Sequence, residues 1–346
     1  MIKTTHTPYL IFLIAFICLP SYLLAFSGQP LQDSIITKKI WDGGTHNAFP
    51  DIIRYKNAFY CSFREGQTHV DSLNRGIARI IKSKDGENWE TVAILKSDIY
   101  DLRDPKLSIT PQGKLMVIMA GSIWGNLNKK FTAKEIVPMV AFSDKKGETF
   151  TSPELINMDT INEGLNWIWR VTWHKGTGYG VVYHMMFYRQ NEVFLMKTKN
   201  GRDFEMLSKL EVDGAPSEAT VRFDKKGKMF ILLRRIKNGM LITGKRPYKN
   251  WTYEPLDYPL GGPNFLFRNK NKMLVATRGG EKNQRTIVQE TNRLGQVEKK
   301  IALPSGGDTG YPGMLIYKGK LWVAYYSSHE KKVAIYLSKI PLDKTF

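Results

Sequence analysis

Residues 113–121 read GKLMVIMAG, a turn residue followed by a hydrophobic strand, and this pattern decides the fold because the chain repeats it. The turn residues of successive copies lie 56, 65, 49, 44 and 48 positions apart. A repeat of that length, with a strand in each unit, is typical of a β-propeller. The six copies are Asn57-AFYCSFREG, Gly113-KLMVIMAG, Gly178-YGVVYHMM, Gly227-KMFILLRR, Asn271-KMLVATRGG and Gly319-KLWVAYYSS.

The rest of the chain agrees with an all-β fold. Short strands alternate with Gly, Asn and Lys turns, and helical periodicity is nearly absent. The chain has 346 residues and 42% hydrophobic content, enough for a substantial core. No Pro/Ser-rich linker divides residues 28–346, so we expect a single domain there. We predict a six-bladed β-propeller of four-stranded antiparallel blades, with residues 28 to about 40 leading into the first blade.

The first 27 residues have a different character. A short basic start at Lys3 precedes an apolar run over residues 9–24, followed by Ala25-Phe26-Ser27. This arrangement is typical of a secretory signal peptide over residues 1–27, which predicts export to the periplasm or the medium. A transmembrane anchor is the alternative, but the run is short for a membrane core. Cys18 leaves a lipoprotein site open.

The formal net charge of the chain is +19. Nucleic acid is not the expected partner, because the basic residues are spread over many turns and form no single stripe. An exported basic protein is expected to meet an acidic glycan or an anionic surface, although a basic surface that only aids solubility is equally compatible. No clustered His/Cys spacing and no phosphate-binding loop is found in the sequence, so we expect no metal and no cofactor. We expect a monomer.

The repeat also predicts where a site lies, because equivalent positions in a propeller meet near one axis. Four of the six residues found seven to nine positions before the turn residues have side chains suited to acid–base, ionic or nucleophilic roles. These six are Ala48, Asp104, Arg170, Glu218, Asn264 and Tyr311. Seven positions after the turns lie Arg64, Arg234 and Arg278. The alternative is that these groups line the central channel and satisfy one another.

Glu218 and Tyr311 form a candidate base–nucleophile pair. A phenol, with a pKa of ~10, becomes a useful nucleophile when a neighbouring carboxylate takes its proton. A neutral nucleophile suits a sugar that bears a carboxylate at its anomeric carbon, since a second carboxylate would be repelled. Arginines suit the substrate side because the guanidinium group pairs with carboxylates in a bidentate way. Asp71, in the polar loop after the first repeat, is available to protonate the leaving oxygen.

Three short turns share a hydroxyl residue, then Gly, then a large aromatic residue. Their side chains are expected to hydrogen-bond the turn backbone while Gly takes a positive φ. The turns are Ser83-KDGEN-Trp89, Ser143-DKKGET-Phe150 and Thr198-KNGRD-Phe204. They resemble the Asp-box (BNR) turns of sialidase-type propellers.

The chain resembles the sialidase (neuraminidase) superfamily over residues 40–342. Glu218 precedes Arg234 by sixteen positions, Tyr311 stands in Gly310-Tyr311-Pro-Gly-Met, and Asp71 lies twelve positions before Ser83. The resemblance implies an exo-acting, retaining glycosidase that removes a terminal acidic sugar from a glycan. Tyr311 would be the nucleophile, Glu218 its base and Asp71 the acid/base. Arg234 and Arg285 would bind the substrate carboxylate, with Arg278 as the alternative to Arg285.

One position departs from the family. The first arginine of the family belongs to an R-I-P motif, where this chain has Ala48-Phe49-Pro50. Loss of a charge-assisted hydrogen bond of this kind costs about 1.5–3 kcal/mol. His46, Asn47, Arg64 or Arg103 are the candidates to replace it. The other expected substrate contacts come from Asp104, Arg170, Asn264 and His69, and His69 is also a candidate to assist as acid.

Two other functions remain open from the sequence. The first is a different glycan-degrading reaction on the same propeller, such as a lyase or a glycosidase specific for uronate-linked sugars. His46 or His69 would then act together with Tyr311 as base and acid. The second is a glycan-binding propeller without catalytic activity, in which Asp71, Glu218 and Tyr311 would be dispensable.

Overall fold

The computed structural model describes Met1 and residues 35–346, except residues 72, 128–129, 159–163, 187–190 and 281–282. The predicted signal peptide therefore lies almost wholly outside the described residues. The secondary structure of those residues consists of strands and one short helix, α1 (Leu342–Thr345), which confirms the all-β prediction. In this part of the chain no helix has the length and apolarity that a membrane crossing needs.

Four of the sheets have four strands each, paired antiparallel. Each of the four follows a hydrophobic pattern of buried central strands and a more exposed outer strand. In spatial order they are β2 (His46–Tyr55), β3 (Ala58–Gly66), β4 (Ile77–Ser83) and β5 (Glu90–Leu95); β15 (Ala219–Phe223), β16 (Met229–Leu233), β17 (Met240–Gly244) and β18 (Trp251–Pro255); β19 (Asn264–Phe267), β20 (Lys272–Gly279), β21 (Arg285–Asn292) and β22 (Val297–Ala302); and β23 (Thr309–Tyr317), β24 (Lys320–Ser327), β25 (Ala334–Pro341) and β1 (Ile36–Trp41).

The fifth sheet has nine strands and consists of two antiparallel runs. A single parallel pair, Leu165 with Ile136, joins β11 of one run to β8 of the other. The first run is β6 (Asp101–Ile109), β7 (Leu115–Leu127) and β8 (Lys130–Phe142), with β9 (Glu154–Leu155) paired to β8. The second run is β11 (Leu165–His174), β12 (Thr177–Met185), β13 (Glu192–Thr198) and β14 (Asp203–Leu210), with β10 (Asn157–Met158) paired parallel to β14.

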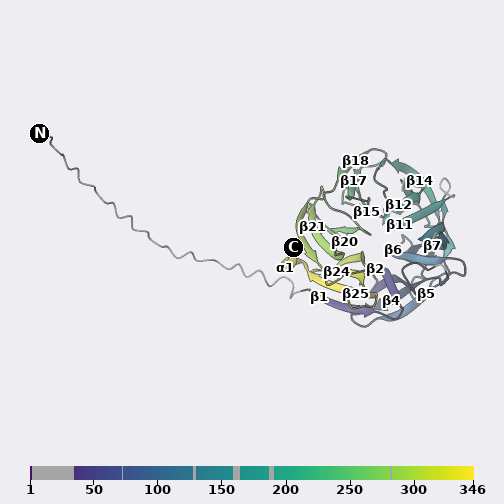
Figure 1. Cartoon of the computed structure of the whole chain (residues 1–346). Coiled ribbons are helices and arrows are strands. Elements are labelled where there is room, and N and C mark those ends of the chain that lie inside the picture. Colours follow the sequence, from purple (N-terminus) through teal and green to yellow (C-terminus); the bar gives the residue numbers. More distant parts are fainter. Residues whose placement is uncertain (2–34, 72, 128–129, 159–163, 187–190, 281–282) are drawn as a thin grey trace.

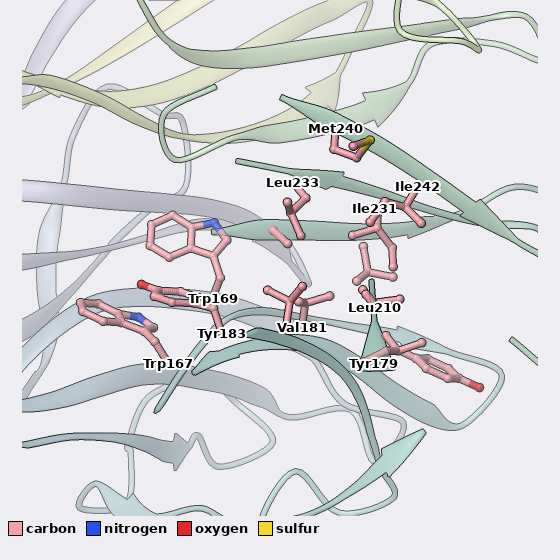
Figure 2. Close-up of a cluster of buried hydrophobic side chains, with 14 of the residues drawn as sticks. Trp167, Trp169, Tyr179, Val181, Tyr183, Leu210, Ile231, Leu233, Met240 and Ile242 are labelled. Atoms are coloured by element: carbon pink, nitrogen blue, oxygen red, sulfur yellow. The ribbon is translucent and has the colours of Figure 1, made fainter. Parts of the chain in front are cut away.

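The six antiparallel runs follow one another around a common centre, as Figure 1 shows. The first strand of each run contacts the first strand of the next, and β23 contacts β2, so the ring closes. Six hydrophobic clusters of described residues each lie between two successive runs, including the two halves of the nine-stranded sheet. Figure 2 shows one cluster, where Val181 and Tyr183 of β12 meet Ile231 and Leu233 of β16. The hydrogen-bonded sheets number five, because the β8–β11 pair joins two runs.

Residues expected to lead into the first blade instead complete the last sheet. β1 pairs antiparallel with β25, with Ile36 opposite Lys339 and Trp41 opposite Ile335. An open strand edge presents unpaired N–H and C=O groups, and pairing from a distant segment satisfies them. The start of the described chain thus ties its end into the ring.

The three aromatic-closed turns make the hydrogen bonds expected of them. The Ser83 and Thr198 hydroxyls accept from the backbone N–H groups of Gly86 and Gly201, both at 2.8 Å. In the second turn the acceptor is the carboxylate of Asp144 and not a hydroxyl group, and it accepts from Gly147 N–H at 2.7 Å. These turns cap the outer hairpins of their sheets and lie away from the central axis.

We expect Gly86→Ala to destabilise the fold more than Gly113→Ala, although both glycines have similar positive φ values of 75° and 70°. The left-handed conformation alone costs a residue with a Cβ roughly 1–2 kcal/mol at either site. A Cβ at Gly86 would also lie 2.3 Å from the ring of Trp322, whereas a Cβ at Gly113 meets nothing within 4 Å. Urea denaturation of the two variants measures the difference. Equal losses would show that the Trp322 contact relaxes without cost.

Candidate active site

Irregular first strands shape the inner rim of the ring. β2, β6, β11 and β23 each have a register shift at the same place, between Ala48 and Asp51 in β2 and at the matching positions elsewhere. Three residues within these shifts have positive φ: Phe49 at 61°, Asp104 at 50° and Tyr311 at 53°. A bulge re-aims side chains, and strained backbone of this type is concentrated at functional sites. Three of the positions found by counting back from the repeat, Asp104, Arg170 and Tyr311, therefore fall within the bulges.

A cavity of about 200 Å³ opens at this rim. Its walls combine two carboxyl groups, a tyrosine hydroxyl and an aromatic surface, which is the composition of a small-molecule site. The predicted residues Tyr311, Glu218, Asp104, Arg103 and His69 line it. The remaining lining residues are Phe49, Val70, Trp124, Trp167, Trp169 and Tyr183.

Tyr311, Glu218 and Arg234 form a closed hydrogen-bonded triangle beside this cavity. The Tyr311 hydroxyl donates to Glu218 Oε1 at 2.9 Å, and Arg234 Nη1 donates to the same oxygen at 2.7 Å. Arg234 Nη1 also lies 3.0 Å from the Tyr311 oxygen. The second carboxylate oxygen of Glu218 accepts from the Ser217 hydroxyl at 2.8 Å. The structure thus brings together three residues that are 16 and 77 positions apart in sequence.

The electrostatics of the triangle suit a base and a protonated phenol. Burial by itself raises the pKa of Glu218, but Arg234 and the hydrogen bonds from Ser217 and Tyr311 more than offset it and lower that pKa. The Glu218 carboxylate in turn raises the pKa of Arg234. Burial and the Glu218 charge raise the pKa of Tyr311. In the resting protein the proton therefore stays on Tyr311 and Glu218 is ionised, ready to accept it.

The sequence favours Arg285 as the third arginine, with Arg278 as the alternative, but the structure places Arg278 beside Tyr311. The guanidinium group of Arg278 lies over the Tyr311 ring, 4.9 Å from its centroid. Burial by itself lowers the pKa of Arg278, but Tyr311, Tyr326 and Glu218 outweigh it and raise that pKa. Arg285 is exposed and donates to the backbone carbonyl of Ser305. Of the two alternatives, Arg278 is the one at the triangle.

Asp71 does not line the cavity. Its Oδ1 accepts from the backbone N–H groups of Leu73 and Asn74, at 2.8 and 3.0 Å, and its Oδ2 accepts from the Asn74 side chain at 2.9 Å. These bonds lower the pKa of Asp71, the Asn74 side chain contributing most. The carboxylate organises its own loop, whereas His69 and Val70 of the same loop reach the cavity.

Three of the candidates to replace the missing first arginine already have partners in the structure: Arg64 and Arg103 at a buried carboxylate, and Asn47 at backbone carbonyls. Arg64 is fully buried and donates to both oxygens of Asp101, at 2.9 and 3.2 Å. Arg103 donates to the His69 carbonyl at 2.7 Å and lies 3.4 Å from Asp101. Asn47 is buried and its side chain donates to the carbonyls of Gly44 and Val333, both at 2.8 Å. Only Arg103 of these reaches the cavity wall, and Phe49 occupies the side of Tyr311 nearest the first strand, with ring centroids 5.3 Å apart.

His46 and His69 converge on Asp308, a residue that the repeat did not single out. His46 Nε2 and His69 Nδ1 lie 3.0 and 2.9 Å from Asp308 Oδ2, and the Tyr326 hydroxyl donates to Oδ1 at 2.8 Å. The side chains of His46, His69 and Asp308 are close enough to one another to hold a metal ion. A metal-bound histidine normally donates its other N–H, yet His46 Nδ1 is buried without a partner among the described residues. The residues fit a hydrogen-bonded network around an ionised Asp308 better than a metal centre.

Arg170 and Asn264 satisfy the alternative stated for the repeat positions, since both are buried and paired inside the ring. Arg170 Nη1 donates to Asp51 at 2.6 Å. Asn264 accepts from Arg222 at 2.9 Å and donates to the Pro312 carbonyl at 3.2 Å. Neither lines the cavity. The positions seven to nine residues before the turns therefore include channel residues as well as cavity residues.

Sequence reasoning missed most of the aromatic wall and the Asp308 anchor. Trp124 comes from the long β7–β8 hairpin and donates its indole N–H to Asp101 at 3.2 Å, while Tyr183 stacks on Trp167 with centroids 5.9 Å apart. Asp308 precedes Tyr311 by three residues and lies two positions outside the range of seven to nine residues before the turn. A wider window before the last turn would have included it.

No protein-family sequence profile matches the chain, and no curated protein sequence matches it. Solved structures do match. A protein of unknown function from Dyadobacter fermentans superposes with a TM-score of 0.74 at 18% identity, covering 89% of this chain and 99% of that one.

Two neighbours have named activities. The sialidase of Trypanosoma rangeli, solved with the inhibitor DANA, has a TM-score of 0.69 at 14% identity and covers 86% of this chain, which spans 55% of the sialidase. The α-L-arabinanase of Penicillium chrysogenum, solved with arabinobiose, has a TM-score of 0.68 at 12% identity, covering 90% and 99%. At such identities the likeness shows the fold alone. The fold is β-propeller-like and of the sialidase type, which confirms the resemblance predicted from the sequence at the level of fold.

Proposed function

We propose that the chain is a retaining glycoside hydrolase whose reaction takes place in the Tyr311–Glu218 cavity of a six-bladed propeller. The observation that supports it best is the triangle of Tyr311, Glu218 and Arg234 at the wall of a sugar-sized cavity. The closed ring of first strands supports the six-blade count. The sialidase and arabinanase neighbours, both glycosidases on this fold, agree with the reaction class.

The reaction begins with attack of the Tyr311 oxygen on the anomeric carbon, as its proton passes to Glu218 Oε1. Arg234, within hydrogen-bond distance of both oxygens, stabilises the negative charge as it develops on the phenol oxygen. The bond from the anomeric carbon to the leaving oxygen breaks, and a second acid protonates that oxygen. Water then attacks the glycosyl-tyrosine, giving its proton to the conjugate base of that acid, and the proton on Glu218 returns to Tyr311.

The substrate we propose is a glycan with a terminal acidic sugar. Arg234 and Arg278 flank Tyr311 and would face a carboxylate on the anomeric carbon. A cavity of about 200 Å³ is below the range usual for drug-sized ligands, which favours one terminal ring and hence exo action. Export by residues 1–27 and a monomeric state remain predictions.

A neutral terminal sugar is the second candidate. The first strand has Ala48 where the family has an arginine, and the next residue, Phe49, lines the cavity. The cavity wall carries two carboxyl groups, Asp104 and Glu218, against one arginine, Arg103. Aromatic faces and carboxyl groups bind the apolar face and the hydroxyls of a neutral sugar. The arabinanase neighbour lends the same support.

The test is turnover of aryl glycosides of N-acetylneuraminic acid, glucuronic acid and L-arabinose, with the product anomer followed by proton NMR. Retention on an acidic sugar supports the first candidate, and turnover of arabinoside alone supports the second. Inversion would contradict the covalent mechanism. An unsaturated product absorbing in the far ultraviolet would indicate a lyase, and binding without turnover would indicate a glycan-binding propeller.

A further inference from the structure

The mechanism needs a proton donor for the leaving oxygen, and Asp71 is poorly placed for it. Both of its carboxylate oxygens are used by the backbone and side chain of its own loop. Hydrogen bonds to the charged form keep a carboxyl group ionised, which is the wrong state for an acid. The donor must therefore be sought among the groups that line the cavity.

Asp104 has the geometry that Asp71 lacks. It lines the same cavity as Glu218 and Tyr311, and only 4% of its surface is exposed. Its Oδ1 is buried and has no hydrogen-bond partner among the described residues. Its backbone is held at a φ of 50° inside the β6 bulge. A buried polar atom without a partner is costly, and strained backbone adds to that cost, so both features call for a functional reason.

The surroundings of Asp104 favour the protonated form of its carboxyl group by raising its pKa. Burial raises its pKa most, and the nearby Glu218 charge adds to this, while Lys106, Arg103 and His69 act in the opposite direction without overcoming it. Glu218, in contrast, is held ionised by Arg234. Two carboxyl groups in one cavity whose environments separate their protonation states in this way are the pattern of an acid and a base.

We propose that Asp104 is the general acid/base of the reaction, a role that rests on the glycosidase function proposed above. Protonated Asp104 gives its proton to the leaving oxygen as the glycosidic bond breaks. The resulting carboxylate then takes a proton from the water that attacks the glycosyl-tyrosine, which restores the acid. No outside reactant other than water is required.

The other ionisable groups at the cavity are less suited. His69 is about half exposed, and its Nδ1 lies 2.9 Å from Asp308, which does not line the cavity. Lys106 lies behind the lining residues: it donates to the backbone carbonyls of Phe49 and Pro50, at 2.9 and 3.2 Å, and its ammonium group lies over the Trp169 ring. A guanidinium group is too weak an acid for this role, and Arg103 uses its Nη1 on the His69 carbonyl.

The test compares Asp104→Asn with Asp71→Asn on two glycosides of the sugar that the wild type cleaves, a methyl glycoside and a 2,4-dinitrophenyl glycoside. A methoxide leaving group needs protonation and dinitrophenolate does not. For Asp104→Asn we expect a loss on the order of 10²–10⁴ on the methyl glycoside and less than about 10-fold on the other. Asp71→Asn should show no such dependence on the leaving group, nor should the exposed control Asp98→Asn.

Several outcomes would overturn the assignment. Equal losses of Asp104→Asn on the two glycosides would mean that Asp104 binds or supports the site but does not donate the proton. A leaving-group dependence in Asp71→Asn alone would return the role to the loop. Absence of turnover by the wild type on every glycoside would remove the glycosidase function and, with it, this role. An active wild type with no leaving-group dependence in Asp104→Asn would remove only the role of Asp104.

A second measurement does not depend on activity. A carboxyl group whose pKa is raised by folding takes stability away as the pH rises from its ordinary value of ~4 through its folded value. The melting temperature of Asp104→Asn relative to wild type should therefore rise between pH 4 and pH 8. A melting-temperature difference between Asp104→Asn and the wild type that stays constant from pH 4 to pH 8 would show that Asp104 is ionised in the folded protein and cannot act as the acid.

Discussion

Tyr311→Phe is expected to lower kcat on the order of 10³-fold or more, with intact folding and substrate binding. The change removes one oxygen, the atom that attacks the anomeric carbon, and leaves the ring that packs against Phe49 and Trp169. Glu218→Gln should cost a similar amount, because the amide cannot take the phenol proton. Pre-steady-state and steady-state turnover of the aryl glycoside measure both losses.

The control for removing a buried hydroxyl is Tyr258→Phe, since the Tyr258 hydroxyl donates to the Gly295 carbonyl at 3.1 Å on another sheet junction. Its kcat should match the wild type. The double variant Tyr311→Phe/Glu218→Gln should be little worse than either single variant, because the two residues act as a unit. Additive losses would mean that Glu218 acts on the substrate independently of Tyr311, as a nucleophile in its own right.

The sequence was most informative where the repeat sets the geometry. Glu218 and Tyr311 stand nine and eight positions before their turn residues, and Arg234 and Arg278 both stand seven positions after theirs. A closed ring must bring such matching positions of different runs to one rim. That argument needs no side-chain detail, and the hydrogen-bonded triangle agrees with it. It could not separate cavity residues from channel residues, because Arg170 and Asn264 lie in the same offset range as Glu218 and Tyr311. Arg170 and Asn264 are held instead by Asp51 and Arg222, partners that the repeat does not reveal.

Loops and long-range partners were beyond the sequence. Asp71 was chosen by its distance to the first turn, yet the direction of its carboxylate depends on the local turn made with Leu73 and Asn74. The sequence favours Arg285 over Arg278 because of its place at the start of a strand. Whether an arginine contacts Tyr311 depends instead on the face of the sheet on which its side chain lies. The role of Asp101 was invisible, because its partners Arg64, Gly76 and Trp124 come from three separate segments.

Asp101→Ala is expected to be the most destabilising change outside the cavity, at about 3–5 kcal/mol in the free energy of unfolding. The Asp101 side chain is only 2% exposed, and it accepts from the Arg64 guanidinium group and from Gly76 N–H at 2.9 Å, and from the Trp124 indole at 3.2 Å. Its removal leaves the fully buried charge of Arg64 without a counterion. Removing one partner of a buried pair costs more than the pair contributes, because the remaining charge cannot regain water.

The matched control is Asp213→Ala, which breaks an ion pair of similar length. Asp213 lies 2.7 Å from Arg235, but its side chain is 88% exposed, so the loss should be within about 1 kcal/mol. Urea denaturation of both variants measures the contrast. Because Asp101 also anchors Trp124 and lies 3.4 Å from Arg103, Asp101→Ala should loosen the cavity wall as well and weaken substrate binding. Equal stability of the two variants would mean that Arg64 finds another acceptor, and the cavity wall would then depend on the loop at residues 66–76 rather than on Asp101.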